Sequence, residues 1–322
     1  MGFDTSFHPV DLPLIESRLL PYLAGQGGDD DINDLIADAV RIRKVRFRAK
    51  AWALGVQAYV REHEGIDFEP HLYVWGRPFF LVGDGPERIA EGMRRYLAAS
   101  ATGVDGTGVD TTGVDAIAAE MIDRLDPALS GRIEPDAGGR LPDDDALAAG
   151  LAMPLRMLRG SAVALRAGQR HVRRPEDGRE FDAAELLTRE VPYCVVEFAA
   201  ALMPGWMSRG YTWPTHLCAE AGIGAVGFTA PTPLTGLLRE EFPDLEWQDP
   251  APTIVGNYMV GGLVPVDRVA DARTRLADHR DRLKCDALDV QKIDEAMAVA
   301  EQFGLGFCEA AEIYSGMDGN LN

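Results

Sequence analysis

The chain of 322 residues has few cysteines, and they are widely spaced. They form no CxxC pair and no dense framework of the kind that small secreted domains use; they are Cys194, Cys218, Cys285 and Cys308. We therefore expect reduced thiols. Hydrophobic residues make up 46% of the chain, so packing rather than disulfides should supply its stability.

The sequence also lacks a recognisable secretion signal and a membrane-spanning stretch. Its first residues become polar at Asp4, without the basic start and apolar run of a signal peptide. The longest apolar run, from Val191 to Met203, contains Pro192 and Glu197 and is shorter than the roughly 20 residues that a bilayer requires. These features predict a cytoplasmic protein without membrane association.

Positive charge is scarce, because 32 basic residues face 51 acidic ones and the net charge is −19. A chain of this charge is repelled by nucleic acids and anionic membranes, so binding to either is not expected. A basic protein or a small molecule is the better partner. Most of the basic residues are Arg, and Ala, Gly, Asp and Val abound, which indicates GC-rich coding of the bacterial type rather than a mechanism.

Local metal and nucleotide motifs are missing as well. No two histidines lie at HxxxH or HxH spacing, so the sequence predicts neither a metal site nor a cofactor. Gly222, Gly224 and Gly227 match GxGxxG in letters. A helix is predicted before them and a short strand after, which reverses the order that brings a phosphate to a helix N-terminus.

Helical periodicity dominates what is present. Residues 33–62 carry apolar side chains in two stripes on opposite sides, which predicts a central helix with two packing partners. Segments 2–10, 71–80 and 253–264 favour strands, and residues 306–314 are predicted as a final helix. Because strands are few and scattered, we predict an α+β fold, dominated by helices, with a small and mainly antiparallel sheet.

Three tandem pentapeptides, ATGVD, GTGVD and TTGVD, occupy residues 101–115. A period of five matches neither helix nor strand, so we interpret them as a linker; a calcium loop is the alternative, although the dense oxygen ligands of such loops are missing. The linker would divide an N-terminal α+β part, residues 1–100, from a mainly helical part, residues 116–322. These parts could also pack as one domain.

Aromatic side chains gather in two segments. If residues 71–80 form one strand, alternation places the side chains of one face together, namely His71, Tyr73, Trp75, Arg77 and Phe79. A turn at Gly76-Arg77 would make a hairpin instead and keep only the first three together. The second segment is a predicted loop with Trp206, Tyr211 and Trp213. If the segments meet, they line a ligand recess or an anchor site; core packing is the ordinary alternative.

Three residues are candidates for acid–base or nucleophilic chemistry. Glu197 lies in the apolar stretch VVEFAAA, where a carboxylate needs a partner or shifts toward its neutral form. A structural ion pair with an arginine of the central helix would explain it equally. His216 and Cys218 are close in sequence, but residues two apart on a helix point about 200° apart. Glu309 and Glu312 are expected on the surface of the final helix.

The central helix contains six positive charges between Arg41 and Lys50. They predict either an anion site or a set of ion pairs with the many acids of the chain. The sequence as a whole favours a binding or interaction module whose aromatic-lined recess holds a small ligand or a basic protein partner, as in an inhibitor or immunity-type protein. The alternative is an enzyme of unassigned class with a dispersed acid/base site.

Overall fold

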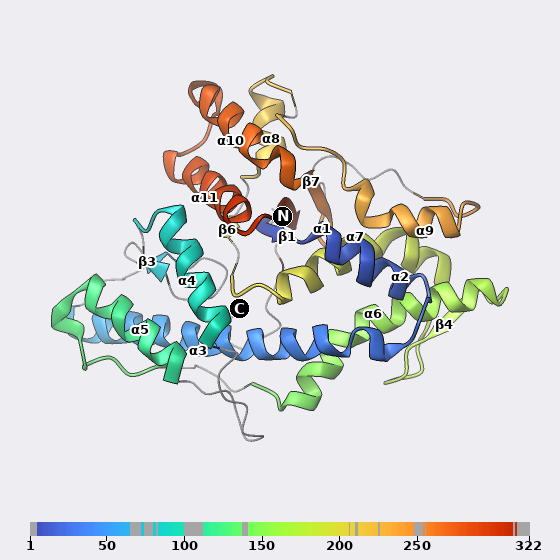
Figure 1. Cartoon of the computed structure of the whole chain (residues 1–322), viewed down its shortest axis with the longest axis horizontal. Helices are drawn as coiled ribbons and strands as arrows, with labels where there is room; N and C mark the ends of the chain where they lie inside the picture. Colours follow the sequence, from blue (N-terminus) through green and yellow to red (C-terminus); the bar gives the residue numbers. More distant parts are fainter. Residues whose placement is uncertain are drawn as a thin grey trace.

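A four-stranded antiparallel sheet lies at the centre of a mainly helical molecule, as the computed structural model shows (Figure 1). The predicted fold class, helix-dominated α+β, is confirmed. The structure describes residues 5–64, 72–73, 80–81, 83–99, 112–136, 141–205, 207–209, 212–224, 226–247, 254, 256–311 and 313.

The strand order in the sheet is β6-β1-β8-β7, with every neighbouring pair antiparallel. The strands are β1 (Thr5–Val10), β6 (Met207–Arg209), β7 (Val260–Val264) and β8 (Gly306–Ala311). β1 and β8 pair along their whole length, from Thr5 opposite Ala311 to Val10 opposite Gly306. Every residue of both strands is buried, so the sheet joins the two ends of the chain inside the core.

The final predicted helix, residues 306–314, is wrong, because β8 occupies most of it. The preceding helix ends at Phe303, and Gly304 adopts the left-handed conformation (φ 65°) that commonly terminates helices. A short apolar run fits a buried strand and a buried helix equally well by periodicity. The β1 partner strand, almost 300 positions earlier in the chain, decides between them.

Helices surround the sheet. They are α1 (Leu12–Leu14), α2 (Leu20–Leu23), α3 (Asn33–Glu64), α4 (Pro86–Ala99), α5 (Thr112–Leu125), α6 (Asp144–Arg166), α7 (Ala183–Ala201), α8 (Pro214–Glu220), α9 (Gly236–Glu241), α10 (Val269–Asp278) and α11 (Ala287–Phe303). A π-helical turn at residues 15–19 joins α1 to α2. Two small hairpins complete the described elements: β2 (Leu72–Tyr73) with β3 (Phe80–Leu81), and β4 (His171–Arg173) with β5 (Glu180–Asp182).

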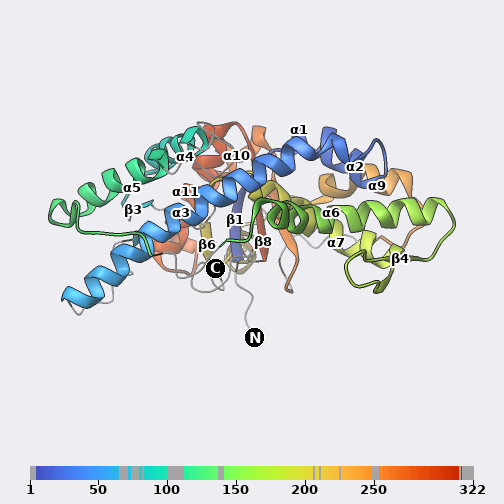
Figure 2. The same ribbon diagram turned by 90° about the horizontal axis from the view of Figure 1, so that it is seen from below.

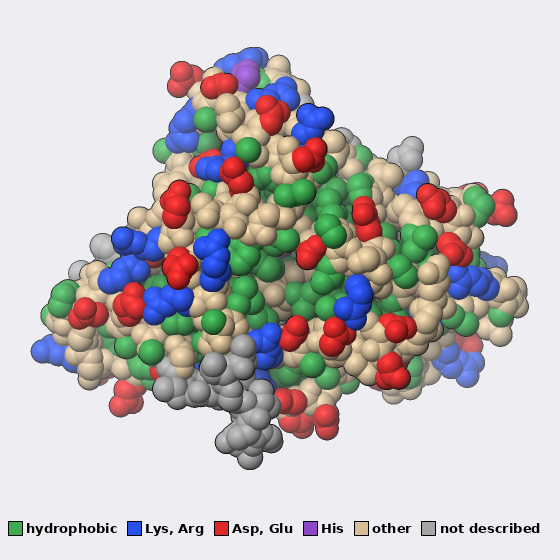
Figure 3. Space-filling model, viewed as in Figure 1, with side chains coloured by type: hydrophobic (Ala, Val, Ile, Leu, Met, Phe, Trp, Pro, Cys, Tyr) green, Lys and Arg blue, Asp and Glu red, His purple; other side chains and the backbone are tan. Residues whose placement is uncertain are grey.

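The molecule is a flattened, three-armed body (Figures 1 and 2). One arm contains α8, α10 and α11, a second contains α4, α5 and the end of α3, and the third contains α6, α9 and the β4–β5 hairpin. Acidic and basic side chains are interspersed over the arms on the face shown in Figure 3, while hydrophobic side chains gather toward its middle.

Two hydrophobic cores lie on opposite faces of the sheet. Phe7 and Phe307 point into the first core, which also contains the buried side chains of α4, α10 and α11. Val10 and Cys308 point into the second, with those of α6 and α7. Both cores combine residues from before position 100 and after position 116, while the proposed division of the chain into two parts stays a prediction.

Helix α3 matches the predicted central helix and contributes to both cores. Its first turns, including Leu35 and Ala39, belong to the second core, and the later Val45, Ala49 and Val56 belong to the first. The helix therefore has two packing partners, as predicted, but they follow one another along its length and do not correspond to the two apolar stripes.

Residues 112–115 of the last pentapeptide repeat are helical, where a linker was predicted. Helix α5 begins at Thr112, within the predicted linker, and Val114 is buried. Asp115 accepts hydrogen bonds from Arg48 Nε and Trp52 Nε1, both at 2.7 Å. These contacts with α3 stabilise a helical turn that the five-residue period alone does not predict. Residues 101–111 lie outside the described part of the chain.

The two described ends of the aromatic segment, Leu72–Tyr73 and Phe80–Leu81, are separate strands that pair with each other. Leu72 pairs with Leu81 and Tyr73 with Phe80 in antiparallel register. This is the arrangement that Gly76 and Pro78 favour, because neither residue suits the middle of a strand.

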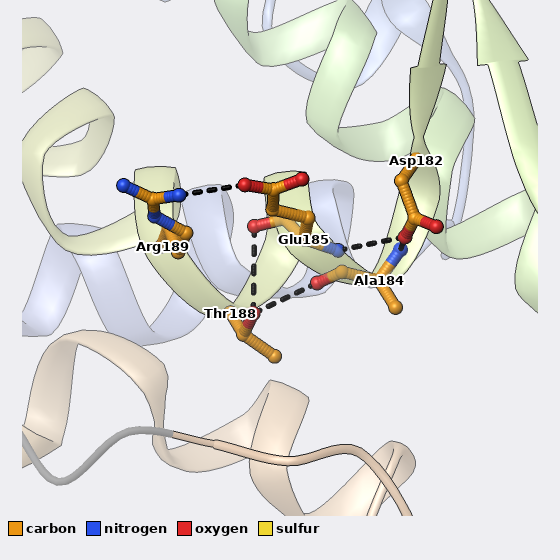
Figure 4. Close-up of polar contacts among 5 residues, drawn as sticks. All are labelled: Asp182, Ala184, Glu185, Thr188 and Arg189. Carbon is orange, nitrogen blue, oxygen red and sulfur yellow. Dashed lines mark hydrogen bonds and ion pairs between the residues drawn. The ribbon is translucent and has the colours of Figure 1, made fainter.

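Helix α7 begins after a capping aspartate (Figure 4). Asp182 Oδ1 accepts hydrogen bonds from the amides of Ala184 and Glu185, both at 3.1 Å. Inside the first turns, Thr188 Oγ1 donates to the Ala184 carbonyl at 2.9 Å and Arg189 pairs with Glu185 at 2.6 Å. The helix therefore starts at Ala183, directly after its capping residue, and it continues through Pro192.

Replacing Asp182 by Ala should lower the free energy of unfolding by about 1 kcal/mol, because two amide donors at the helix start lose their acceptor. Replacing it by Asn is the control, since Asn caps helices about as well as Asp. Chemical denaturation of both variants tests this expectation. Equal destabilisation by Ala and Asn would show that charge at this position, and not capping, is what matters.

Candidate functional site

A fully buried carboxylate, Glu309, lies on the central strand β8. Gly262 N donates to its Oε1 at 2.9 Å, and Thr215 N donates to its Oε2 at 3.2 Å. The Thr215 hydroxyl donates to Oε1 as well. Three donors from β7 and α8 thus converge on one carboxyl group from the neighbouring strand.

The local sequences explain this geometry. Helix α8 begins with Trp213 as N-cap residue and Pro214 in its first turn, and Trp213 makes no side-chain capping hydrogen bond. Glu309 takes the role of the missing cap, because its carboxyl oxygens accept the hydrogen bonds that a capping side chain would accept. On β7, Gly261 leaves room for the carboxyl: a Cβ there would lie 2.9 Å from Cγ and 3.0 Å from Cδ of Glu309.

Burial raises the pKa of Glu309 from 4.5 to about 7, although its hydrogen bonds from Gly262 and Thr215 act in the opposite direction. Removing a carboxylate from water costs more than these three donors return. Glu309 therefore changes its charge near neutral pH, in the interior of the protein.

The other face of the same strand pair carries a buried imidazole. His8 lies opposite Cys308, and its Nε2 is 2.6 Å from Ser6 Oγ. Burial and, to a smaller extent, the nearby positive charge of Arg46 lower the pKa of His8 from 6.5 to about 3. The ring is accordingly neutral at physiological pH. Two ionisable groups thus lie on opposite faces of β1 and β8, and burial shifts the pKa of each toward its uncharged form.

The predicted catalytic candidates on α8 do not converge. His216 Nε2 is 3.1 Å from Glu220 Oε1 on the exposed side of the helix. Cys218 is buried on another side, and burial, together with the charge of Glu309, raises its pKa to about 12. A thiol in that state is a poor nucleophile. The divergence of about 200° expected for residues two apart is what separates them.

Glu197 lies at the junction of α7 and α3. Burial raises its pKa, and the positive charge of Arg43 acts in the opposite direction. Burial likewise lowers the pKa of Arg43, and Glu197 opposes that change. This mutual effect supports the structural interpretation, in which a carboxylate of α7 compensates an arginine of the central helix.

Other charges between Arg41 and Lys50 are paired within the molecule. Arg41 pairs with Asp38 at 2.8 Å, Lys44 with Asp144, and Arg48 with Asp115 at 2.7 Å. These partners come from α3 itself, α6 and α5. The arrangement favours the ion-pair interpretation of this segment over an anion site.

Most of the predicted aromatic recess lies outside the described residues. This applies to His71, Trp75, Arg77, Trp206 and Tyr211, while for Tyr73 the structure describes the backbone alone. Trp213 is partly buried and packs against both cores. Its ring centroid is 4.8 Å from that of His216. Trp213 therefore joins the two cores rather than standing at the centre of an exposed patch.

A groove of about 670 Å³ lies between α10 and α11. Buried aliphatic side chains form part of its lining: Leu217, Leu276, Leu283, Val290 and Ile293. Polar side chains complete it: Arg273, Thr274, Arg280, Gln291, Asp294 and Glu301. Arg273 Nε donates to Asp294 at 2.9 Å and its Nη1 donates to Glu301 at 2.6 Å, so these charges bridge the two helices.

Sequence reasoning missed the position of Glu309 and this groove. The signal for Glu309 was the alternation in Gly306–Ala311, where Phe307 and Glu309 share a face, together with the pair Gly261-Gly262 in the preceding strand. The groove depends on the packing of α10 on α11, which no local pattern specifies.

No family model matches the chain, and the comparisons with curated proteins and with solved structures gave no match. Within the described residues, no helix is long and apolar enough to cross a membrane, and no cluster of three metal-ligating side chains occurs. The interpretation of function therefore depends on the geometry of the chain itself.

Replacing Gly261 by Ala should lower the free energy of unfolding by about 1–3 kcal/mol, because the added methyl group collides with the Glu309 carboxyl group. Gly150, in the middle of α6 with open space around it, is the matched control. Its replacement by Ala should raise stability by about 0.5–1 kcal/mol. Chemical denaturation of both variants tests this expectation. Equal changes in the free energy of unfolding would show that the methyl group added at Gly261 causes no steric clash.

The pH dependence of the free energy of unfolding should show that His8 is buried in its neutral form. Its folded-state pKa is lowered, so the stability it contributes is present above pH 6.5 and is lost as the pH falls toward 3. As the pH falls from 6.5 to 4.5, the free energy of unfolding of the wild type, relative to that of His8→Gln, should therefore decrease by about 3 kcal/mol, at about 1.36 kcal/mol per pH unit. Glu309 acts in the opposite sense between pH 4.5 and 7, which should leave the wild type nearly flat.

Denaturant titrations of the wild type and His8→Gln at several pH values test this expectation. Parallel pH profiles for the two proteins would show that His8 is not buried in its neutral form.

Proposed function

We propose that this protein is a binding protein for a small amphipathic molecule, with an aliphatic body and an anionic head, and that the groove between α10 and α11 is its site. The observation that carries the proposal is the groove itself. Its volume of about 670 Å³ lies in the range of small-molecule sites, and it combines an apolar floor with a few polar groups, as such sites do.

The floor suits an aliphatic body. Leu217 comes from α8, Leu276 from α10, and Val290 and Ile293 from α11. There is no aromatic ring among the described residues that line the groove, so stacking of a planar ligand is not the basis of this proposal. Three helices contribute to the floor, and the pocket is formed by tertiary packing.

The polar lining favours an anionic head. Arg273 pairs with both Asp294 and Glu301, and Arg280 supplies the second positive charge, so the two carboxylates are balanced by two arginines in the lining. Arg280 is exposed and donates through Nη2 to the Ala287 carbonyl at 3.2 Å, which leaves further N–H groups of its guanidinium for a ligand. Arginine is the side chain best suited to hold an anionic oxygen pair.

Binding of 1-decanesulfonate, measured by isothermal titration calorimetry, tests the site. Ala277 is exposed on α10 and lines the groove, so Ala277→Trp should fill it and weaken binding at least tenfold. Ala119→Trp, at an exposed position of α5, is the matched control and should bind as the wild type does. Equal binding by all three proteins would place the ligand elsewhere.

The head group is tested with a ligand pair. Arg280→Gln should weaken 1-decanesulfonate by about tenfold, because a charge-assisted hydrogen bond is lost. It should leave decyltrimethylammonium unaffected or improved. If the wild type prefers the cationic ligand, the acidic side chains dominate the groove, and the basic partner suggested by the net charge of −19 becomes the better proposal.

A further inference from the structure

Helix α8 is held at both ends by side chains from other elements. At its N-terminus the amide and hydroxyl of Thr215 bond to Glu309. At its C-terminus Arg282 Nη2 donates to the Ala221 carbonyl at 2.8 Å, and Gly222 adopts the left-handed conformation (φ 62°). A helix of seven residues is not stable alone, so these two anchors and its buried face keep it in place.

The position of α8 also determines the floor of the groove. Leu217 is two residues after Thr215, is buried, and lines the groove between α10 and α11. Cys218, next to it, packs into the first core. A displacement of the first turn of α8 away from β7 and β8 would therefore carry Leu217 with it.

We propose that Glu309 is a proton-operated clamp: its uncharged form holds the first turn of α8 against the sheet, and its ionisation releases that turn and opens the floor of the groove. This regulation rests on the groove being the binding site, as proposed above. The clamp itself stands on the contacts of Glu309 alone.

The direction follows from the surroundings of the carboxyl group. Glu309 is fully buried, so its charged form gains by opening, which admits water. Its pKa is about 7 in the closed state and returns toward 4.5 in an open, hydrated state. The closed state is thus most stable below pH 4.5, opening increases as the pH rises toward 7, and it levels off above pH 7.

The ionisable groups on the packed elements are few. On α8, Cys218 is the group whose pKa Glu309 raises, and Arg275 of α10 acts on the same thiol in the opposite direction. Strand β7 has no titratable side chain, and Phe7 lies opposite Glu309 on β1. Helix α11 carries Asp289, Lys292, Asp294, Glu295 and Glu301, and α8 also carries His216 and Glu220 on its exposed side. A Glu309→Gln variant separates the titration of Glu309 from all of these.

Hydrogen exchange of the α8 amides between pH 5 and 7.5 tests the clamp. After correction for intrinsic exchange, the opening equilibrium of the wild type should rise roughly tenfold per pH unit up to pH 7. Arg282→Gln, which removes the other anchor, should exchange faster at every pH with the same slope. Glu309→Gln should show no slope. A flat wild-type profile, or an equal slope in Glu309→Gln, overturns the proposal.

A second variant keeps the test decisive if Glu309→Gln does not fold. Thr215→Val removes a hydroxyl that favours the charged carboxylate, so the rise in opening should continue to higher pH than in the wild type. An unchanged or lower end point overturns the clamp.

Binding of 1-decanesulfonate, whose charge does not change in this range, separates the two proposals. Weaker binding at pH 7.5 than at pH 5, with the difference lost in Glu309→Gln, supports both. A pH-dependent exchange of α8 without binding of the ligand at any pH overturns the groove and leaves the clamp. Binding that is equal at both pH values, together with flat exchange, overturns the clamp and leaves the groove.

Discussion

The pairing of β1 with β8 is the constraint on which the rest of the structure depends. It joins the first and last described elements, and the Ile313 amide donates to Ser6 Oγ across 307 positions of sequence. Both hydrophobic cores use this strand pair as a shared wall, with Phe7 and Phe307 on one side and Val10 and Cys308 on the other. Contacts of such long range form late and make folding slow, since the chain must close a long loop first.

The same strand pair carries two fully buried ionisable side chains. Glu309 and His8 would each cost several kcal/mol if buried in the charged form, and burial shifts the pKa of each toward its neutral form. Their proton equilibria act on stability in opposite directions over much of the range between pH 4.5 and 6.5. The protein can therefore contain a carboxyl group that titrates near pH 7 without losing its fold as the pH changes. Because the fold is retained while Glu309 titrates, a change in pH can act locally on the contacts of this residue.

Local patterns predicted the helices well and the sheet poorly. The central helix and the strand predicted at residues 2–10 depend on near neighbours in sequence, and the structure confirms the helix as α3 and the described part of the strand as β1. Strand β8 could not be separated from a helix by periodicity, because its identity depends on β1. Glu309 was predicted on the surface for the same reason. On the predicted helix it would be solvated, whereas on β8 it is fully buried. Of the candidates on α8, the sequence correctly separated His216 from Cys218, because helix geometry is local.

The two proposals meet at helix α8. The helix is too short to be stable alone, it caps neither of its own ends with a side chain, and it borrows Glu309 and Arg282 for that purpose. A short helix that is stabilised by distant residues is coupled to them, since loss of either contact destabilises the whole helix. Leu217 transmits that coupling to the groove beside it. The seven residues of α8 thus connect strand β8 and the carboxyl group of Glu309 with the groove between α10 and α11.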